Sequence, residues 1–356
     1  MNDNHNPWGN PNHPHGPTPP RPWEDSHRFG SNHLPPPPPG PNPLRRLLRQ
    51  NANGVCAALA LVFAVVPVFT FVMQLLYELF PGFAVFMFGL SPVGIGLLNM
   101  IVFAVALLVP TLFIMRFYRI PTSVALPMRR TPAHLTVSGV FCTLGASVVG
   151  VCIAFILSAI ISAATGATPT MPDFSPPDYG VAATIIFLIS ISVFPAVFEE
   201  LLFRGVIMQS LRRFGDPFAM VVSAILFAML HRNLLQGPNA LITGLVLGYF
   251  TLRTGSLIPA IVAHFVNNLL VGGASVIMVH LPEHSAGILN LSIIPVYLVL
   301  GIIGVAIMLR KSGGFVPLRQ SPTGLFEWQK YLLFFTSPLA LVFIAATIWQ
   351  TWQFIN

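Results

Sequence analysis

The chain has 356 residues, of which 54% are hydrophobic and only 8% are charged. These values exclude an ordinary soluble domain, because apolar stretches of about 18 residues or more, nearly free of charge, are typical of transmembrane helices. The net charge of +7 falls mainly in loops and in the tail, as membrane topology requires, and does not indicate a nucleic-acid partner.

Residues 1–50 are the first predicted region, a cytoplasmic tail rich in proline and histidine. Residues 1–44 hold 14 of the 34 prolines and five of the ten histidines. Such a segment cannot bury a core, so we expect it to be disordered, with a stiff polyproline stretch. A proline-binding partner protein is an open alternative to a tail without any partner.

Nine apolar runs follow the tail, and their continuous rather than alternating pattern predicts helices, not a barrel. In chain order they are 54–79, 93–115, 135–163, 181–203, 217–231, 238–252, 257–279, 289–309 and 331–353. The stretch 81–91 is expected at the membrane interface. The fifth and sixth runs are short and are separated by Gly237 and Pro238, which break a helix, so they either cross fully or form a re-entrant hairpin.

The predicted fold class is therefore an all-α, polytopic transmembrane helical bundle of seven to nine spans. We divide it into N-terminal helices (51–180), a central core (181–285) and C-terminal helices (286–356). With the N-terminus in the cytoplasm, Arg232 alone among the 18 basic residues violates the rule that basic residues stay inside. In a bacterial cell this membrane would be the plasma membrane.

An ionisable group inside a span is by default a functional hypothesis, and the first such group is a pair of glutamates. Glu200 and Arg204 are four residues apart, so they share a helix face and can form an ion pair. Glu199 is rotated away by about 100° and lacks that partner, which leaves it free to act as a general base. The alternative is a surface pair at the membrane rim, with Arg204 reaching the headgroups.

Two further spans carry polar residues. His231 ends a short helix of about 22 Å, which need not cross the whole membrane. His231 can therefore lie inside the bundle as a site residue. The alternative is a structural residue at the end of a helix. His264 and Asn268 share one face and can donate hydrogen bonds to a developing oxyanion. The alternative for this pair is a hydrogen-bonded clamp between helices. Asn267 points elsewhere, as a helix-packing residue would.

The sequences EELLFR, FAMLH and HFVNN resemble the three motifs of the CPBP intramembrane proteases. This CAAX-protease and bacteriocin-processing (Abi) family includes the type II CAAX-prenyl endopeptidases. Its pattern is Glu-Glu-x-x-x-Arg, then Phe-x-x-x-His, then His-x-x-x-Asn or Asp. The matching residues, within about residues 181–280, are Glu199, Glu200, Arg204, Phe227, His231, His264 and Asn268.

The resemblance implies peptide-bond hydrolysis inside the bilayer. Glu199 with His231 would activate a water, and His264 with Asn268 would stabilise the oxyanion. Glu200 and Arg204 would hold the helix.

The resemblance leaves the metal requirement open, because the family has been described both as metalloproteases and as metal-free glutamate proteases. The sequence lacks the His-Glu-x-x-His helix that supplies two zinc ligands and a base, so we expect no cofactor. A catalytic zinc needs three protein ligands and an open position. Glu199, His231 and His264 would be the zinc ligands in the metal-dependent alternative.

The predicted function is thus that of an intramembrane endopeptidase acting on membrane-associated or lipidated peptides or proteins in the lipid bilayer. One alternative is a catalytically silent immunity factor or scaffold. A second is a proton-coupled transporter, in which the carboxylates and histidines form a relay. Transporters often show paired repeats or matched broken helices, whereas this chain has one broken region and no evident repeat.

Overall fold

The computed structural model describes residues 43–80, 91–171, 180–321 and 324–355. Within these ranges the chain is built from helices, and the only β-type pairing is an isolated bridge between Pro169 and Ile355. The predicted all-α class is therefore confirmed. Most of the predicted tail and most of the predicted interfacial stretch at 81–91 lie outside the described residues.

The helices follow one another in a single chain order. They are α1 (Pro43–Leu79), α3 (Pro92–Phe117), α4 (Thr122–Ala125), α5 (Ala133–Thr165), α6 (Val181–Glu200), the π-helix η2 (Leu201–Ile207), α7 (Met208–Leu211), the 3-10 helix η3 (Arg212–Phe214), α8 (Asp216–Leu230), α9 (Gly237–Thr254), α10 (Ile258–Val279), α11 (Glu283–Lys311), α12 (Glu327–Phe335) and α13 (Pro338–Trp352). The first helix corrects the predicted boundary of the tail at residue 50, because α1 already begins at Pro43. Proline is well suited to the first turn of a helix, where its missing N–H has no acceptor to lose.

Six helices of the described ranges are long and apolar enough to cross a membrane, or seven if α12 and α13 count as one bent span. The chain is thus a multi-pass membrane protein, and of these two counts only seven falls within the predicted range of seven to nine spans. The count of nine is too high because α8 has only 15 residues and α9 does not qualify as a span. These two helices pack against each other, which fits the hairpin alternative.

The last predicted span, 331–353, is not one straight helix. It is broken into α12 and α13, whose axes differ by 72°. Ser337 adopts an extended conformation, with ψ of 143°, and Pro338 begins the second helix. Proline lacks the N–H that would continue the helical hydrogen bonding and disfavours helical geometry in the residue before it, which accounts for the break here.

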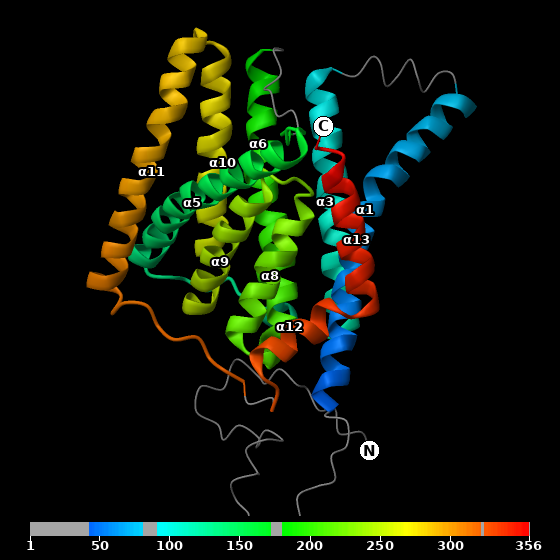
Figure 1. Ribbon diagram of the computed structural model, residues 1–356. Coiled ribbons are helices and arrows are strands. Elements are labelled where there is room, and N and C mark those ends of the chain that lie inside the picture. The colour runs from blue at the N-terminus through cyan, green and yellow to red at the C-terminus, as the bar shows by residue number, and fades with distance from the viewer. Residues whose placement is uncertain (1–42, 81–90, 172–179, 322–323, 356) are drawn as a thin grey trace, which may run out of the picture.

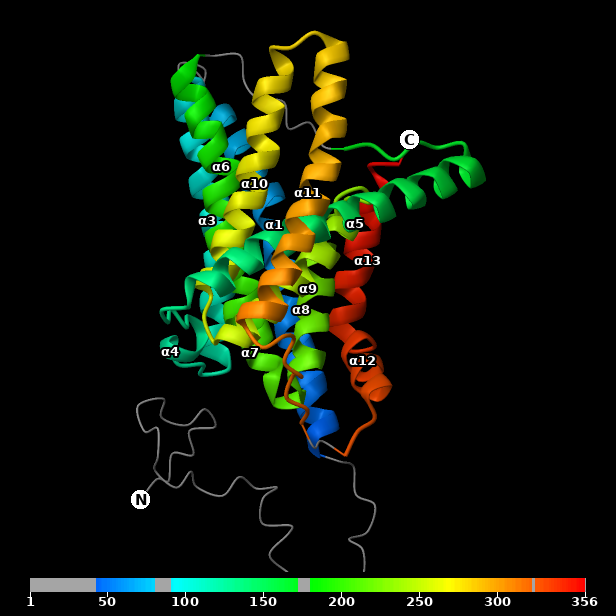
Figure 2. The ribbon, with the colours of Figure 1, turned by 90° about the vertical axis from the view of Figure 1, so that its left-hand side faces the viewer.

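The bundle is crossed obliquely by α5, which lies over the upright helices α10 and α11 (Figures 1 and 2) and also packs against α9. Glycine permits the close crossing with α11, since a Cβ at Gly145 would lie 2.7 Å from the Cα of Gly301. Ser138 adds a hydrogen bond of 2.7 Å to the carbonyl oxygen of Gly304. Small residues at such crossings are typical of membrane helices.

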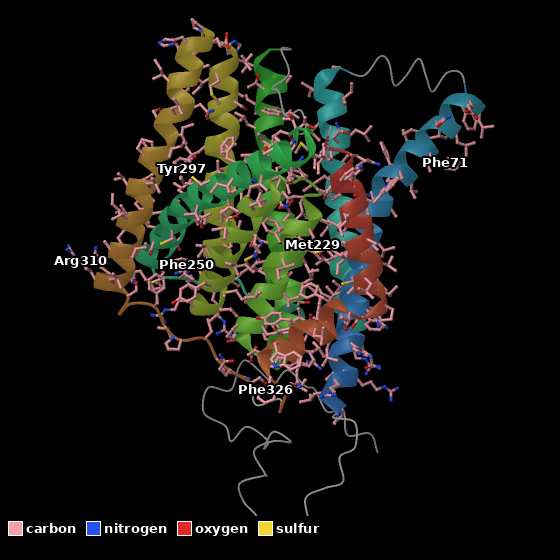
Figure 3. The ribbon with its side chains drawn as sticks, in the orientation of Figure 1. Phe71, Met229, Phe250, Tyr297, Arg310 and Phe326 are labelled. Carbon is pink, nitrogen blue, oxygen red and sulfur yellow. The ribbon has the colours of Figure 1, made fainter. Side chains whose placement is uncertain are left out.

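The largest buried apolar cluster lies on the other side of the bundle. It joins the first half of α1 with η2, α8, α12 and α13. Beyond Pro67 the second half of α1 leans away from the other helices (Figure 1), and Phe71 on it points outward (Figure 3). The firmly packed part of the molecule is therefore the part that holds η2 and α8.

Candidate active site

The two adjacent carboxylates lie where α6 changes into a π-helix. Glu199 and Glu200 are both buried at the end of α6, and the seven-residue η2 follows them directly. The helical path continues to Phe214, well past the predicted end at residue 203. Because π-helices frequently occur at functional sites, this local widening marks the segment that carries Arg204.

Glu200 and Arg204 form the predicted ion pair. Nη1 of Arg204 donates to Oε1 of Glu200 at 2.8 Å, and both side chains have an exposed fraction of 0%. The guanidinium also donates through Nη2 to the carbonyl oxygen of Gly244 at 3.1 Å and lies 4.4 Å from the ring centroid of Phe227. The alternative of a pair at the membrane rim is wrong, because Arg204 is fully enclosed by protein.

Gly244 on α9 is a part of the site that the sequence analysis missed. A Cβ at this position would lie 3.1 Å from Nη2 of Arg204 and 3.3 Å from both Ala224 Cβ and Phe227 Cδ1. Glycine leaves room for the backbone to approach the guanidinium, whereas a Cβ would require these side chains to shift. The available signal was the Gly-x-x-x-Gly spacing of Gly244 and Gly248, which is typical of close helix packing.

His264 on α10 faces both glutamates. Its Nδ1 lies 2.8 Å from Oε1 of Glu200, and its Nε2 lies 3.8 Å from Oε2 of Glu199. A carboxylate paired with a guanidinium only accepts, so Nδ1 of His264 carries the hydrogen of this bond. Glu200 therefore orients an imidazole as well as holding Arg204, and the remaining ring nitrogen of His264 is directed toward Glu199.

His231 reaches the same region from the end of α8. Its Nδ1 lies 2.9 Å from the carbonyl oxygen of Phe227. A carbonyl oxygen can only accept, so Nδ1 donates and Nε2 of the neutral ring is left as an acceptor. The rings of His231 and His264 both lie against the ring of Phe227, with centroid distances of 4.8 and 5.9 Å. The structure thus brings the predicted carboxylate and both predicted imidazoles into one region, in which Glu199 and His264 are buried and His231 is partly buried.

The side chains of Asn267 and Asn268 are both engaged in hydrogen bonds within the protein. Nδ2 of Asn268 donates to the carbonyl oxygen of Ile191 on α6 at 3.2 Å, which is the clamp that the sequence left open as an alternative. Nδ2 of Asn267 donates to Oδ1 of Asn268 at 3.2 Å. An amide nitrogen carries two hydrogens, so Asn268 joins α6 to α10 with one N–H and keeps a second for another acceptor.

The residues of the metal-dependent alternative do not form a metal site in this arrangement. Over the described ranges, no three or more His, Cys, Asp or Glu side chains are grouped closely enough to hold a metal ion. Glu199, His231 and His264 are therefore not assembled as zinc ligands. A zinc site requires ligand atoms at about 2.0–2.2 Å from one shared point.

The comparisons with known proteins match this part of the chain. Residues 181–270 match the family described as type II CAAX prenyl endopeptidase Rce1-like, whereas no curated protein and no solved structure matches the chain. The matched range begins with α6 and ends within α10, so it contains every residue of the three motifs. Residues 181–270 are therefore similar to the domain of the Rce1-like type II CAAX prenyl endopeptidases.

Proposed function

We propose that the chain is an intramembrane endopeptidase that uses Glu199 to activate a water against a peptide bond. The observation that carries this proposal is the contrast between the two adjacent glutamates. Glu200 is occupied by Arg204 and His264, each at 2.8 Å. The shortest ion-pair contact of Glu199, at 3.8 Å to His264, is too long for a hydrogen bond. A carboxylate that lies beside imidazoles without a short hydrogen bond to them is suited to act as a general base.

The attacking water would donate its two hydrogens to the carboxylate of Glu199 and to Nε2 of His231. Both groups accept, which leaves a lone pair of the water oxygen to attack the carbonyl carbon. Glu199 takes one proton as the new C–O bond forms and the carbonyl oxygen becomes an oxyanion. When the C–N bond breaks, Glu199 returns that proton to the amine nitrogen, so the enzyme is regenerated.

The oxyanion would be stabilised by Nε2–H of His264 and by the second N–H of Asn268. His264 donates through both ring nitrogens only as an imidazolium. Glu200, 2.8 Å from its Nδ1, stabilises that positive charge, and Arg204 in turn balances Glu200. Donors fixed in a buried site in this way are among the largest contributions to catalysis. In this route the proton transfers and the oxyanion contacts are all made by side chains of the chain itself.

We further propose that the N-terminus lies in the cytoplasm and that, if the cell is bacterial, the chain resides in its plasma membrane. The start of α1 and the ends of α3, α9 and α11 lie at one end of the bundle (Figure 1). Arg310 marks this end in Figure 3. The basic residues at these helix ends include Arg45, Arg46, Arg49, Arg116, Arg253, Arg310 and Lys311. Labelling of single introduced cysteines from one side of intact cells tests this orientation.

The substrates would be membrane-associated or lipidated peptides or proteins. The test is a proteome-wide comparison of protein termini in membranes from cells with and without this chain. We expect termini that appear only when the chain is present and that lie in or next to membrane-anchored segments. Identical termini in both samples would contradict the proposal and favour a scaffold or transporter.

A further inference from the structure

The turn that joins α8 to α9 carries a site residue and an unusual backbone conformation. His231 is its first residue, and only five residues separate His231 from the start of α9 at Gly237. Arg232 has a φ of 51°, a left-handed conformation that residues other than glycine seldom adopt. Contacts outside the turn must hold a residue in such a conformation.

Asn233 supplies such contacts with one buried side chain, which has an exposed fraction of 3%. Its Oδ1 accepts from the backbone N–H of Leu235 at 2.9 Å and of Gln236 at 3.2 Å. Its Nδ2 donates to the carbonyl oxygen of Thr170 at 2.8 Å. The same amide therefore closes the turn before α9 and fastens it to the segment that follows α5.

Thr170 is itself held in place by the C-terminal segment. Its backbone N–H donates to the carbonyl oxygen of Phe354 at 2.8 Å, and its hydroxyl donates to the same oxygen at 3.3 Å. The bridge between Pro169 and Ile355 extends this pairing, and the two segments lie side by side in Figure 2. Both lie outside residues 181–270, the range of the family match.

Arg232 makes a second connection from the same turn to the outer helices. Its Nη1 lies 3.4 Å from Oε1 of Gln350 on α13, and its Cζ lies 5.4 Å from the ring centroid of Phe63 on α1. These contacts also give a structural role to the one arginine that violates the predicted topology.

We propose that Asn233 is a positioning residue for His231, and that the C-terminal segment acts on the site through it. The inference rests on the proposed function of His231 as an acceptor for the attacking water. Nδ1 of His231 is fixed by the last turn of α8, so the direction of Nε2 depends on where that turn ends. With Asn233 in place the chain leaves α8 along one path, and without it the ring loses its fixed direction.

Ser256 offers a matched control at the turn before α10. Its hydroxyl donates to the carbonyl oxygen of Arg129 at 2.8 Å and accepts from the N–H of Ile258 at 3.3 Å. It is as deeply buried as Asn233 and likewise joins a turn to a distant backbone carbonyl. It belongs to a turn that carries no proposed catalytic residue.

The experiment compares Asn233→Ala, Asn233→Asp and Ser256→Ala in full-length protein in lipid vesicles, with a peptide cleaved by the wild type. A misplacement of about 1 Å can lower a rate by about 10²-fold, so we expect Asn233→Ala to lower kcat by about 10- to 100-fold with little change in KM. Asn233→Asp keeps the Oδ1 acceptor but loses the Nδ2 donor, so a similar loss of kcat would assign the effect to the tie with Thr170. Ser256→Ala should keep kcat within about twofold of the wild type. We expect this even if its unfolding temperature falls by as much as that of Asn233→Ala.

A second readout does not depend on cleavage. Ring ¹⁵N signals of labelled histidine report which nitrogen of His231 carries the proton, with His231→Gln used for assignment. We expect an Nδ1–H ring in the wild type and in Ser256→Ala, and a mixture of tautomers in Asn233→Ala. Wild-type ring signals in Asn233→Ala, or an equal loss of kcat in Ser256→Ala, would overturn the inference. If the wild type cleaves nothing, the proposed function fails, while the ring signals still decide whether Asn233 fixes His231.

Discussion

The carboxylate side of the site, on α6, η2 and α10, differs from the imidazole side at the end of α8 in what holds it. On the first side, charged groups hold one another: Glu200 contacts Arg204 and His264, each at 2.8 Å. On the second side, His231 is held by a backbone carbonyl at 2.9 Å and by a turn fastened through Asn233 to a segment 63 residues away. The first side is therefore held by charged groups within residues 181–270, whereas the second also depends on contacts with segments outside that range.

This difference predicts which substitutions damage the fold and which damage only the chemistry. Breaking a buried ion pair leaves an uncompensated charge and is strongly destabilising. Removing a group that makes no short ion pair, such as Glu199, should leave the packing intact. Loosening the α8 side should change the rate of cleavage more than the stability of the bundle.

The largest expected effect is the loss of cleavage in Glu199→Gln. The amide keeps the shape of the side chain but cannot accept the proton of the attacking water, so turnover should fall to background. The unfolding temperature should match that of the wild type, as measured in the same detergent. Glu283→Gln, an exposed carboxylate at the start of α11, is the control, and we expect it to retain full turnover.

The next largest effect is on stability, in Glu200→Ala. This change leaves Arg204 buried without its partner, and loss of one member of such a pair lowers the free energy of unfolding by about 3–5 kcal/mol. Cleavage should fall as well, because His264 loses the acceptor that orients it. Equilibrium unfolding in mixed micelles measures the first effect. If Glu200→Ala and Arg204→Ala add without any coupling in a double-mutant cycle, the ion pair does not stabilise the bundle.

A smaller and more specific effect is expected for Asn268→Ala. Loss of one oxyanion donor typically lowers kcat by about 10²–10³-fold, and the clamp to Ile191 is lost as well. Steady-state kinetics should show the change in kcat rather than in KM. Asn267→Ala is the neighbouring control, and an equal loss of kcat in both variants would show that the amide of Asn268 only packs the helices.

The smallest of these effects is expected for Gly244→Ala. The added methyl group would lie 3.1 Å from Nη2 of Arg204 and 3.3 Å from Phe227 Cδ1, and overpacking of this kind typically lowers stability by about 1–3 kcal/mol. Gly273→Ala on α10 is the matched control, because its methyl group would meet nothing within 4 Å. Equal unfolding temperatures for the two variants would contradict the close approach of α9 to Arg204.

The sequence predicted those parts of the site that depend on spacing within one helix. Glu200 and Arg204 are paired because residues four apart share a helix face, and the apolar runs located the long spans. The bond between Glu200 and His264 joins residues 64 positions apart, and no helical period carries that information. Asn268 was predicted with two alternative roles, and the partner that revealed the clamp, the carbonyl of Ile191, is a backbone group of another helix.

Other features were missed because packing decides them. The π-helix η2 has no distinctive composition, so the predicted helix ended too early, at residue 203. The break between α12 and α13 has a local cause in Pro338, but proline also occurs inside α1, α3, α6 and α11 without ending them. Neighbouring helices can compensate for such prolines in a membrane protein, so sequence alone does not separate a tolerated proline from a break.

The central claim is that Glu199 activates a water rather than attacking the peptide bond itself. The most direct test is a single turnover in H₂¹⁸O, with wild-type protein in excess over a peptide that it cleaves. The account predicts one ¹⁸O atom in the new C-terminal carboxylate of the product and none in the side chain of Glu199. Mass spectrometry that finds ¹⁸O in Glu199 and an unlabelled product would contradict it, because the glutamate would then have acted as a nucleophile.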